Sequence, residues 1–68
     1  MRYNRGIMNG QEIKKLRIKL ELSQERFARE VGVSLNTVNR WENDGMQPSQ
    51  LAIQAIENVK IKYNIGGK

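Results

Sequence analysis

Residues 23–42 read SQERFAREVGVSLNTVNRWE, and this segment contains the signals for two helices set very close together. Ser23 and Ser34 are residues whose side-chain oxygen can cap the first turn of a helix. Gly32 supplies the left-handed residue that ends the first of these helices. Because only Val33 separates Gly32 from Ser34, we expect a tight turn that crosses the helices at roughly 90–120°.

The apolar residues of this segment can hold two helices at that angle. Ala28 is small, as a residue must be where two helices cross closely. Trp41 shares a helical face with Val38, so we interpret it as core rather than as a surface for stacking on bases. The expected inward positions are Phe27, Ala28, Val31, Val33, Val38 and Trp41.

A further helix is expected before this segment. The run Asn9-Gly10-Gln11-Glu12 is typical of a capping box, in which Asn9 and Glu12 bond each other's backbone. Apolar residues at helical spacing predict a helix from Gly10 to near Glu21, with Arg17 interrupting the apolar face. The inward residues are Ile13, Leu16 and Leu20.

A last helix is expected after it. Asn43, Asp44 and Gly45 break the preceding helix, Pro48 favours an extended entry, and Ser49 caps the new helix. The pattern predicts a core face of Leu51, Ala52, Ala55, Ile56 and Val59, with Ile53, Ile61 and Tyr63 widening the apolar arc. No strand signal is present, so the expected fold class is all-α, a compact domain of four helices.

With 68 residues the chain is expected to form one small domain with a single core. We divide it into a flexible basic N-terminal arm over residues 1–8, a folded domain over residues 9–63 and a frayed tail over residues 64–68.

Several chemistries lack the residues they need. The chain has no cysteine and no histidine, and it has no phosphate-binding loop motif, so we expect no metal, no cofactor and no enzymatic activity. It also has no apolar run of signal-peptide or membrane-spanning length. A cytoplasmic location is therefore the expectation.

The charge balance points to a polyanionic partner. Twelve Lys and Arg against seven Asp and Glu give a net charge of +5. DNA, RNA and anionic lipid all fit such a charge, and so does simple solubility. Lys14, Lys15 and Lys19 flank an apolar stripe, as in membrane-surface helices, but the domain core needs that stripe. We therefore expect no membrane binding.

The ordered set of motifs resembles the Cro/phage-repressor (Xre-type) helix-turn-helix family over about residues 11 to 59. The resemblance implies a lambda-repressor-like domain of four, alternatively five, helices, with the helix-turn-helix at helices two and three. Two departures are evident: Gly45 lies three residues after Glu42 rather than two, and the chain looks one helix shorter than the usual five. The matching pieces are LSQERFA at 22–28, VGVS at 31–34, Thr37-Val38, Arg40-Trp41-Glu42 and Pro48-Ser49.

In this family the second helix of the motif enters the DNA major groove. The resemblance therefore makes Leu35, Asn36, Asn39 and Arg40 the base-reading candidates. Asn36 suits adenine, Arg40 suits guanine or else a phosphate, and Leu35 suits a thymine methyl group. RNA fits less well, because a protruding helix cannot enter the narrow A-form major groove.

Other polar residues are candidates for the DNA backbone. Phosphate contact or positioning is expected of Gln24, Ser34, Thr37 and Lys14, and Gln24 could also buttress a base-reading neighbour. Lys15, Lys19, Arg2 and Arg5 are candidates for phosphate contacts or a minor-groove arm, with an ordinary solvated face as the alternative. Arg17 needs a partner for its charge, and the resemblance implies a structural salt bridge to Glu42.

The expected function is sequence-specific binding of double-stranded DNA by a transcriptional regulator, in the form of a repressor. The alternative is an antitoxin that binds a toxin or other protein partner and regulates its own operon. A homodimer on an operator with paired half-sites is expected, because one short helix reads few base pairs. Ile53, Ile61 and Tyr63 favour a dimer contact through the last helix.

Overall fold

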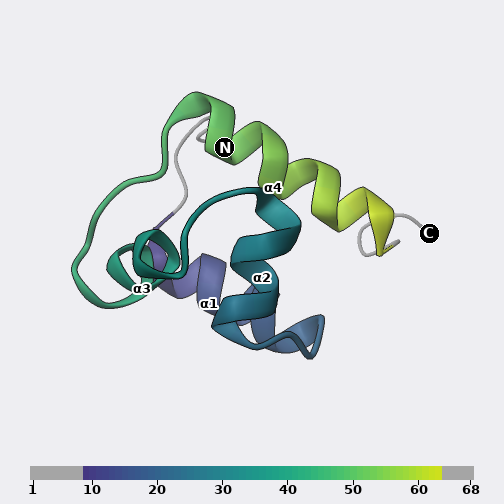
Figure 1. Cartoon of the computed structure of the whole chain (residues 1–68), viewed down its shortest axis with the longest axis horizontal. Helices are drawn as coiled ribbons and strands as arrows, with labels where there is room; N and C mark the ends of the chain where they lie inside the picture. Colours follow the sequence, from purple (N-terminus) through teal and green to yellow (C-terminus); the bar gives the residue numbers. More distant parts are fainter. Residues whose placement is uncertain (1–8, 64–68) are drawn as a thin grey trace, which may run out of the picture.

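A computed structural model describes residues 9–63 and contains four α-helices within that range (Figure 1). The arm expected over residues 1–8 and the tail over residues 64–68 lie outside the described residues. An all-α domain of four helices was predicted, and this prediction is confirmed. The helices are α1 (Gly10–Lys19), α2 (Gln24–Val31), α3 (Leu35–Asn43) and α4 (Gln50–Lys62).

Every helix begins at the residue predicted to cap it. The Asn9 side chain accepts from the backbone of Glu12 at 2.9 Å, and the Glu12 carboxylate accepts from the backbone of Asn9, which completes the capping box. Ser23, Ser34 and Ser49 each accept a backbone N–H three residues ahead. These bonds satisfy amides that have no partner inside the helix.

The end of α1 differs from the prediction. The helix ends at Lys19 rather than near Glu21, and Leu20 is its C-terminal cap. Glu21 has a φ of +61°, in the left-handed region that non-glycine residues seldom adopt. The reversal lets Leu22 pack against the core, and its amide donates to the Arg17 carbonyl at 3.1 Å.

All four helices contribute to one core. Helix α2 contacts both α3 and α4, and α1 contacts α3 (Figure 1). The largest fully buried side chains are Trp41, Phe27, Ile13, Ile56 and Val38. Burying a side chain of this size contributes about 1.5–3 kcal/mol, so a domain this small depends on each of these few residues.

Two assignments on α4 are wrong. Leu51 was predicted in the core but is 83% exposed, and Ile53 was predicted as surplus surface but is only 8% exposed. The apolar arc of α4 is wider than one face, so its composition does not say which edge turns inward. In the folded chain Ala52, Ile56 and Val59 set the direction, and this leaves Leu51 outside.

Gly10 allows α1 to lie unusually close to α3. A Cβ atom at Gly10 would overlap the backbone carbonyl oxygen of Trp41. No side chain could move aside to relieve that overlap, because the obstacle is backbone. The first turn of α1 is therefore packed directly on the last turns of α3.

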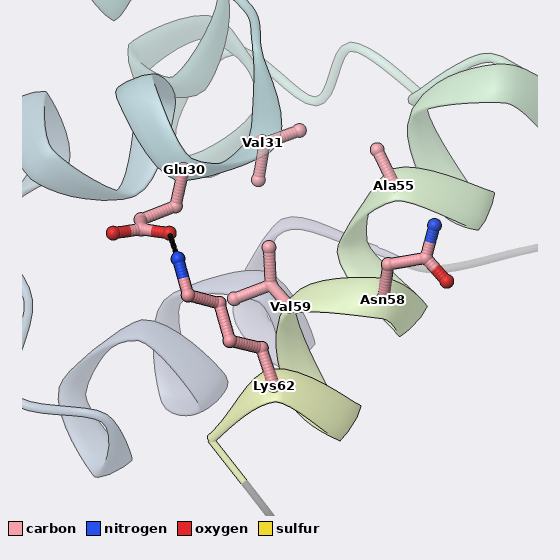
Figure 2. A pocket seen from close by; sticks show the side chains of 6 residues that line it. All are labelled: Glu30, Val31, Ala55, Asn58, Val59 and Lys62. Carbon is pink, nitrogen blue, oxygen red and sulfur yellow. Dashed lines mark hydrogen bonds and ion pairs between the residues drawn. The ribbon is translucent and has the colours of Figure 1, made fainter.

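Glu30 joins α2 to the end of α4. Its carboxylate accepts from Lys62 Nζ at 2.7 Å, and from Arg26 Nε and the Tyr63 hydroxyl, both at 3.3 Å. The hydrogen bond from Lys62 lowers the pKa of Glu30, and the same bond raises the pKa of Lys62. Figure 2 shows this pair at the edge of an open hollow of about 270 Å³ between the two helices. The hollow is lined by Glu30, Val31, Ala55, Asn58, Val59 and Lys62.

Candidate nucleic-acid interface

The turn between α2 and α3 has the predicted form. Gly32 has a φ of +93°, and the amides of Gly32 and Val33 both donate to the Ala28 carbonyl. The turn occupies only the three residues between Val31 and Leu35, so α3 must change direction at once. The two helices thus form a helix-turn-helix unit.

The N-terminus of α3 brings together two predicted phosphate contacts. The Ser34 hydroxyl accepts from the Thr37 backbone at 3.1 Å and shares a hydrogen bond with the Thr37 hydroxyl at 2.8 Å. Both residues therefore cap the helix in the free chain. Backbone N–H groups at such a terminus attract anions through the helix dipole.

The two faces of α3 have opposite characters. Val38 is 0% and Trp41 2% exposed, so both hold α3 in the core as predicted. Leu35 is 47% exposed although it is apolar, and Asn36, Asn39 and Arg40 are exposed too. The four base-reading candidates therefore lie outside the core, where another molecule can reach them.

Asn43 belongs to the same exposed face but was assigned only to the helix break. It is the last residue of α3, four residues after Asn39 and seven after Asn36. Residues at these spacings share one side of a helix. That spacing was the signal available in the sequence, but the turn-forming run Asn43-Asp44-Gly45 masked it.

The ion pair predicted between Arg17 and Glu42 is present and has two-point geometry. Arg17 Nε lies 2.7 Å from Glu42 Oε2, and Arg17 Nη2 lies 3.1 Å from Oε1. The Glu42 side chain is 1% exposed and that of Arg17 is 14% exposed. Arg17 also donates from Nη1 to the Leu22 carbonyl. The pair therefore joins α1 to the last turn of α3 within the protein interior.

Gln24 extends this pair to the exposed face of α3. Its Nε2 donates to Glu42 Oε1 at 3.0 Å, and its Oε1 accepts from Asn39 Nδ2 at 3.5 Å. The sequence predicted Gln24 as a buttress for a neighbour but did not indicate Glu42 as its support. A continuous chain of polar contacts therefore runs from Arg17 through Glu42 and Gln24 to Asn39.

The remaining basic candidates are only partly within the described residues. Lys14, Lys15 and Lys19 are exposed on α1, whereas Arg2 and Arg5 lie outside the described residues. Between residues 9 and 63, no three His, Cys, Asp or Glu side chains gather into a possible metal site. In the same range no helix is long and apolar enough to cross a membrane.

Two curated proteins show what the chain is similar to. It is 38% identical over 58 residues to Antitoxin PezA of Streptococcus pneumoniae serotype 4, which covers 85% of this chain and 35% of that protein. It is 47% identical over 47 residues to the Type II methyltransferase M1.ScrFI of Lactococcus lactis subsp. cremoris, covering 65% of this chain and 12% of that protein. The chain thus spans about a third and an eighth of the lengths of these relatives.

A family model described as Helix-turn-helix matches residues 13–59, more than half of the chain. The match begins in α1 and ends in α4, so it includes the α2–α3 unit and both helices that brace it. The chain therefore belongs to the helix-turn-helix family of DNA-binding domains, of the Cro/C1 (Xre) type.

Proposed function

We propose that the chain binds double-stranded DNA sequence-specifically, with α3 in the major groove, and represses transcription. The observation that carries the proposal is the exposed face of α3, where Leu35, Asn36 and Asn39 lie opposite the buried Val38 and Trp41. We further propose that the chain acts in the cytoplasm, as a homodimer on paired half-sites, by binding rather than by catalysis.

The proposal assigns different tasks to the two halves of the exposed face. Near its N-terminus, Asn36 offers a donor and an acceptor that match adenine N7 and N6, and Leu35 offers a methyl contact to thymine. Arg40, one turn later, reaches guanine or a phosphate. Within residues 9–63, neither Asn36 nor Arg40 is engaged by another side chain, so both are available to DNA.

Asn39 has less freedom than Asn36. One hydrogen of its Nδ2 points to Gln24 Oε1, which leaves the other hydrogen and Oδ1 for a base. Gln24 in turn is held by Glu42, so its second Nε2 hydrogen can meet a phosphate. In this proposal Gln24 positions a reader and touches the DNA backbone, as do Ser34, Thr37 and Lys14.

The test is affinity for a duplex selected from random sequences, compared with a scrambled duplex of equal length. Asn36→Ala should weaken the selected duplex by about 1–3 kcal/mol, relax one base position and leave the scrambled duplex unchanged. Lys14→Ala is the matched contrast, because a phosphate contact should weaken both duplexes equally and lower the salt dependence. Equal losses for Asn36→Ala on the two duplexes would reject its base-reading role.

A second candidate function is an antitoxin that binds a protein partner and represses its own operon. The observation that favours it is the 38% identity to an antitoxin over 85% of this chain. The test is whether an adjacent reading frame encodes a product that arrests growth, and whether co-expression of this chain restores growth. An adjacent product that is harmless when expressed alone would count against this candidate.

A further inference from the structure

The outer side of α4 carries a line of exposed residues that the fold does not use. Leu51 and Ile61 are 83% and 74% exposed, the highest values among the large apolar residues between 9 and 63. Gln54 and Asn58, which lie between them, are also exposed. Spacings of three, four and three residues place all four along one side of the helix. We call Leu51, Gln54, Asn58 and Ile61 the α4 stripe.

This spacing is the one by which one helix packs along another. Apolar seams of paired helices recur at alternating intervals of three and four residues. The α4 stripe has apolar residues at its two ends and amides at its two central positions. A buried amide at such a seam fixes register at some cost in stability.

The α4 stripe is symmetric about Ile56, which suggests its partner. Leu51 lies five residues before Ile56 and Ile61 five after, while Gln54 lies two before and Asn58 two after. In an antiparallel pair of identical helices, Leu51 of one copy therefore faces Ile61 of the other, and Gln54 faces Asn58. A two-fold contact needs this self-complementarity.

The charges beside the α4 stripe are neutralised within one chain. Lys60 lies 3.7 Å from Glu57, and Lys62 lies 2.7 Å from Glu30, toward which Figure 2 shows it extending. The stripe itself is uncharged in a chain whose net charge is +5. Two copies can therefore meet through α4 without opposing like charges, which would cost several kcal/mol.

We propose that the α4 stripe is a self-association surface on which a second copy packs with its α4 antiparallel. Helix α4 packs mainly on α2 and runs along a different edge of the molecule from α3 (Figure 1). Four side chains per copy make a contact smaller than the roughly 1,200–2,000 Å² of stable interfaces. Association is therefore weak in solution. Its role in joining copies on adjacent half-sites rests on the function proposed above.

Sedimentation equilibrium of the purified full chain without DNA tests this surface, from about 10 µM to about 1 mM, where small interfaces dissociate. The wild type should form dimers within this range. Leu51→Gln with Ile61→Gln should raise the dissociation constant about tenfold or more, because both apolar layers lose buried area. Thermal unfolding by circular dichroism checks that these exposed changes leave the fold intact.

Two charged pairs at the central amides test the orientation. Gln54→Lys with Asn58→Glu places opposite charges across an antiparallel contact, so the dimer should be kept or tightened. Gln54→Lys with Asn58→Lys is the matched control and should weaken it. In a parallel pair the first variant would oppose Lys to Lys and Glu to Glu, and would weaken the dimer instead.

A wild-type chain that stays monomeric up to about 1 mM would overturn the proposal, since contacts weaker than this have no standard interface behind them. A dimer insensitive to every α4 stripe variant would overturn it as well, and so would loss of the dimer in the lysine–glutamate variant. Because no DNA is present, a failure to bind DNA is a separate outcome. That failure would reject the proposed function and leave this surface standing.

Discussion

Two ion-pair clusters join helices in this molecule, and they differ in burial rather than in distance. Arg17 and Glu42 connect α1 to α3, and Lys62 and Glu30 connect α4 to α2, each with a closest N–O distance of 2.7 Å. The first pair is 14% and 1% exposed, whereas Lys62 is 64% exposed and Glu30 is 12% exposed. Water screens the second pair and scarcely reaches the first.

The difference shows why equal distances do not imply equal energies. A buried charge that loses its partner keeps the cost of leaving water, whereas an exposed cation that loses its partner is simply hydrated. Each carboxylate has three donor groups, but those of Glu30 come mainly from residues at the surface. The junction that orients α3 is therefore the sensitive one, and the α2–α4 junction is tolerant.

The largest effect should come from Arg17→Met. This change leaves the Glu42 carboxylate buried with Gln24 as its remaining side-chain donor. Loss of one partner from a buried pair costs about 3–5 kcal/mol, a large share of the stability of so small a domain. The measurement is the free energy of unfolding in urea, with wild type and variant compared at neutral pH.

The double variant Arg17→Met with Glu42→Leu is the control for that experiment. Removing both charges removes the uncompensated carboxylate, so the double variant should be more stable than Arg17→Met alone. The resulting coupling in the double-mutant cycle separates charge from packing. If the double variant is no more stable than the single one, packing rather than charge explains the loss.

Gly10→Ala should have an intermediate effect, and its sign is informative. Replacing glycine by alanine inside a helix ordinarily stabilises by about 0.5–1 kcal/mol. Here the new methyl group would overlap the Trp41 carbonyl, so we expect a loss of about 1–3 kcal/mol, as for an overpacked site. Urea unfolding again measures it, with the exposed neighbour Gln11→Ala as the control. A stabilised Gly10→Ala chain would show that α1 can move away from α3.

The sensitive junction was largely predictable from the sequence, for a physical reason. A charge inside an apolar stripe requires a partner, so Arg17 itself indicated that something must face it. Caps and turns act over three or four residues, which is why Asn9, Ser23, Gly32, Ser34 and Ser49 were placed correctly. These are local rules, and a single sequence contains them in full.

The tolerant junction was not predictable, because nothing local specifies it. Glu30 and Lys62 are ordinary charged residues 32 positions apart, and neither interrupts an apolar pattern. The orientation of α4 depends on which edge of a wide apolar arc packs best, and this is why Leu51 and Ile53 were assigned to the wrong sides. The close approach at Gly10 likewise exists only once α1 and α3 are packed.

Glu30→Gln should give the smallest effect, and it should depend on pH. A carboxyl group whose pKa is lowered on folding stabilises the folded state above its ordinary pKa of about 4.3, and loses that contribution as the pH falls through the lowered value. Lys62, whose pKa is raised, contributes below its ordinary value of about 10.4 and stops as the pH rises through the raised one. Between these limits the contribution of the pair should be constant.

We therefore expect Glu30→Gln to lower the thermal unfolding midpoint slightly at neutral pH, with the difference from wild type shrinking below about pH 4. Glu25→Gln is the matched control on α2, because the contact of Glu25 with Arg29 is exposed on both sides at 3.8 Å. A difference that persists unchanged in acid would assign the effect to lost packing of Glu30. A loss as large as that of Arg17→Met would mean that the α2–α4 pair is as shielded from water as the α1–α3 pair, and exposure would then no longer explain the contrast between them.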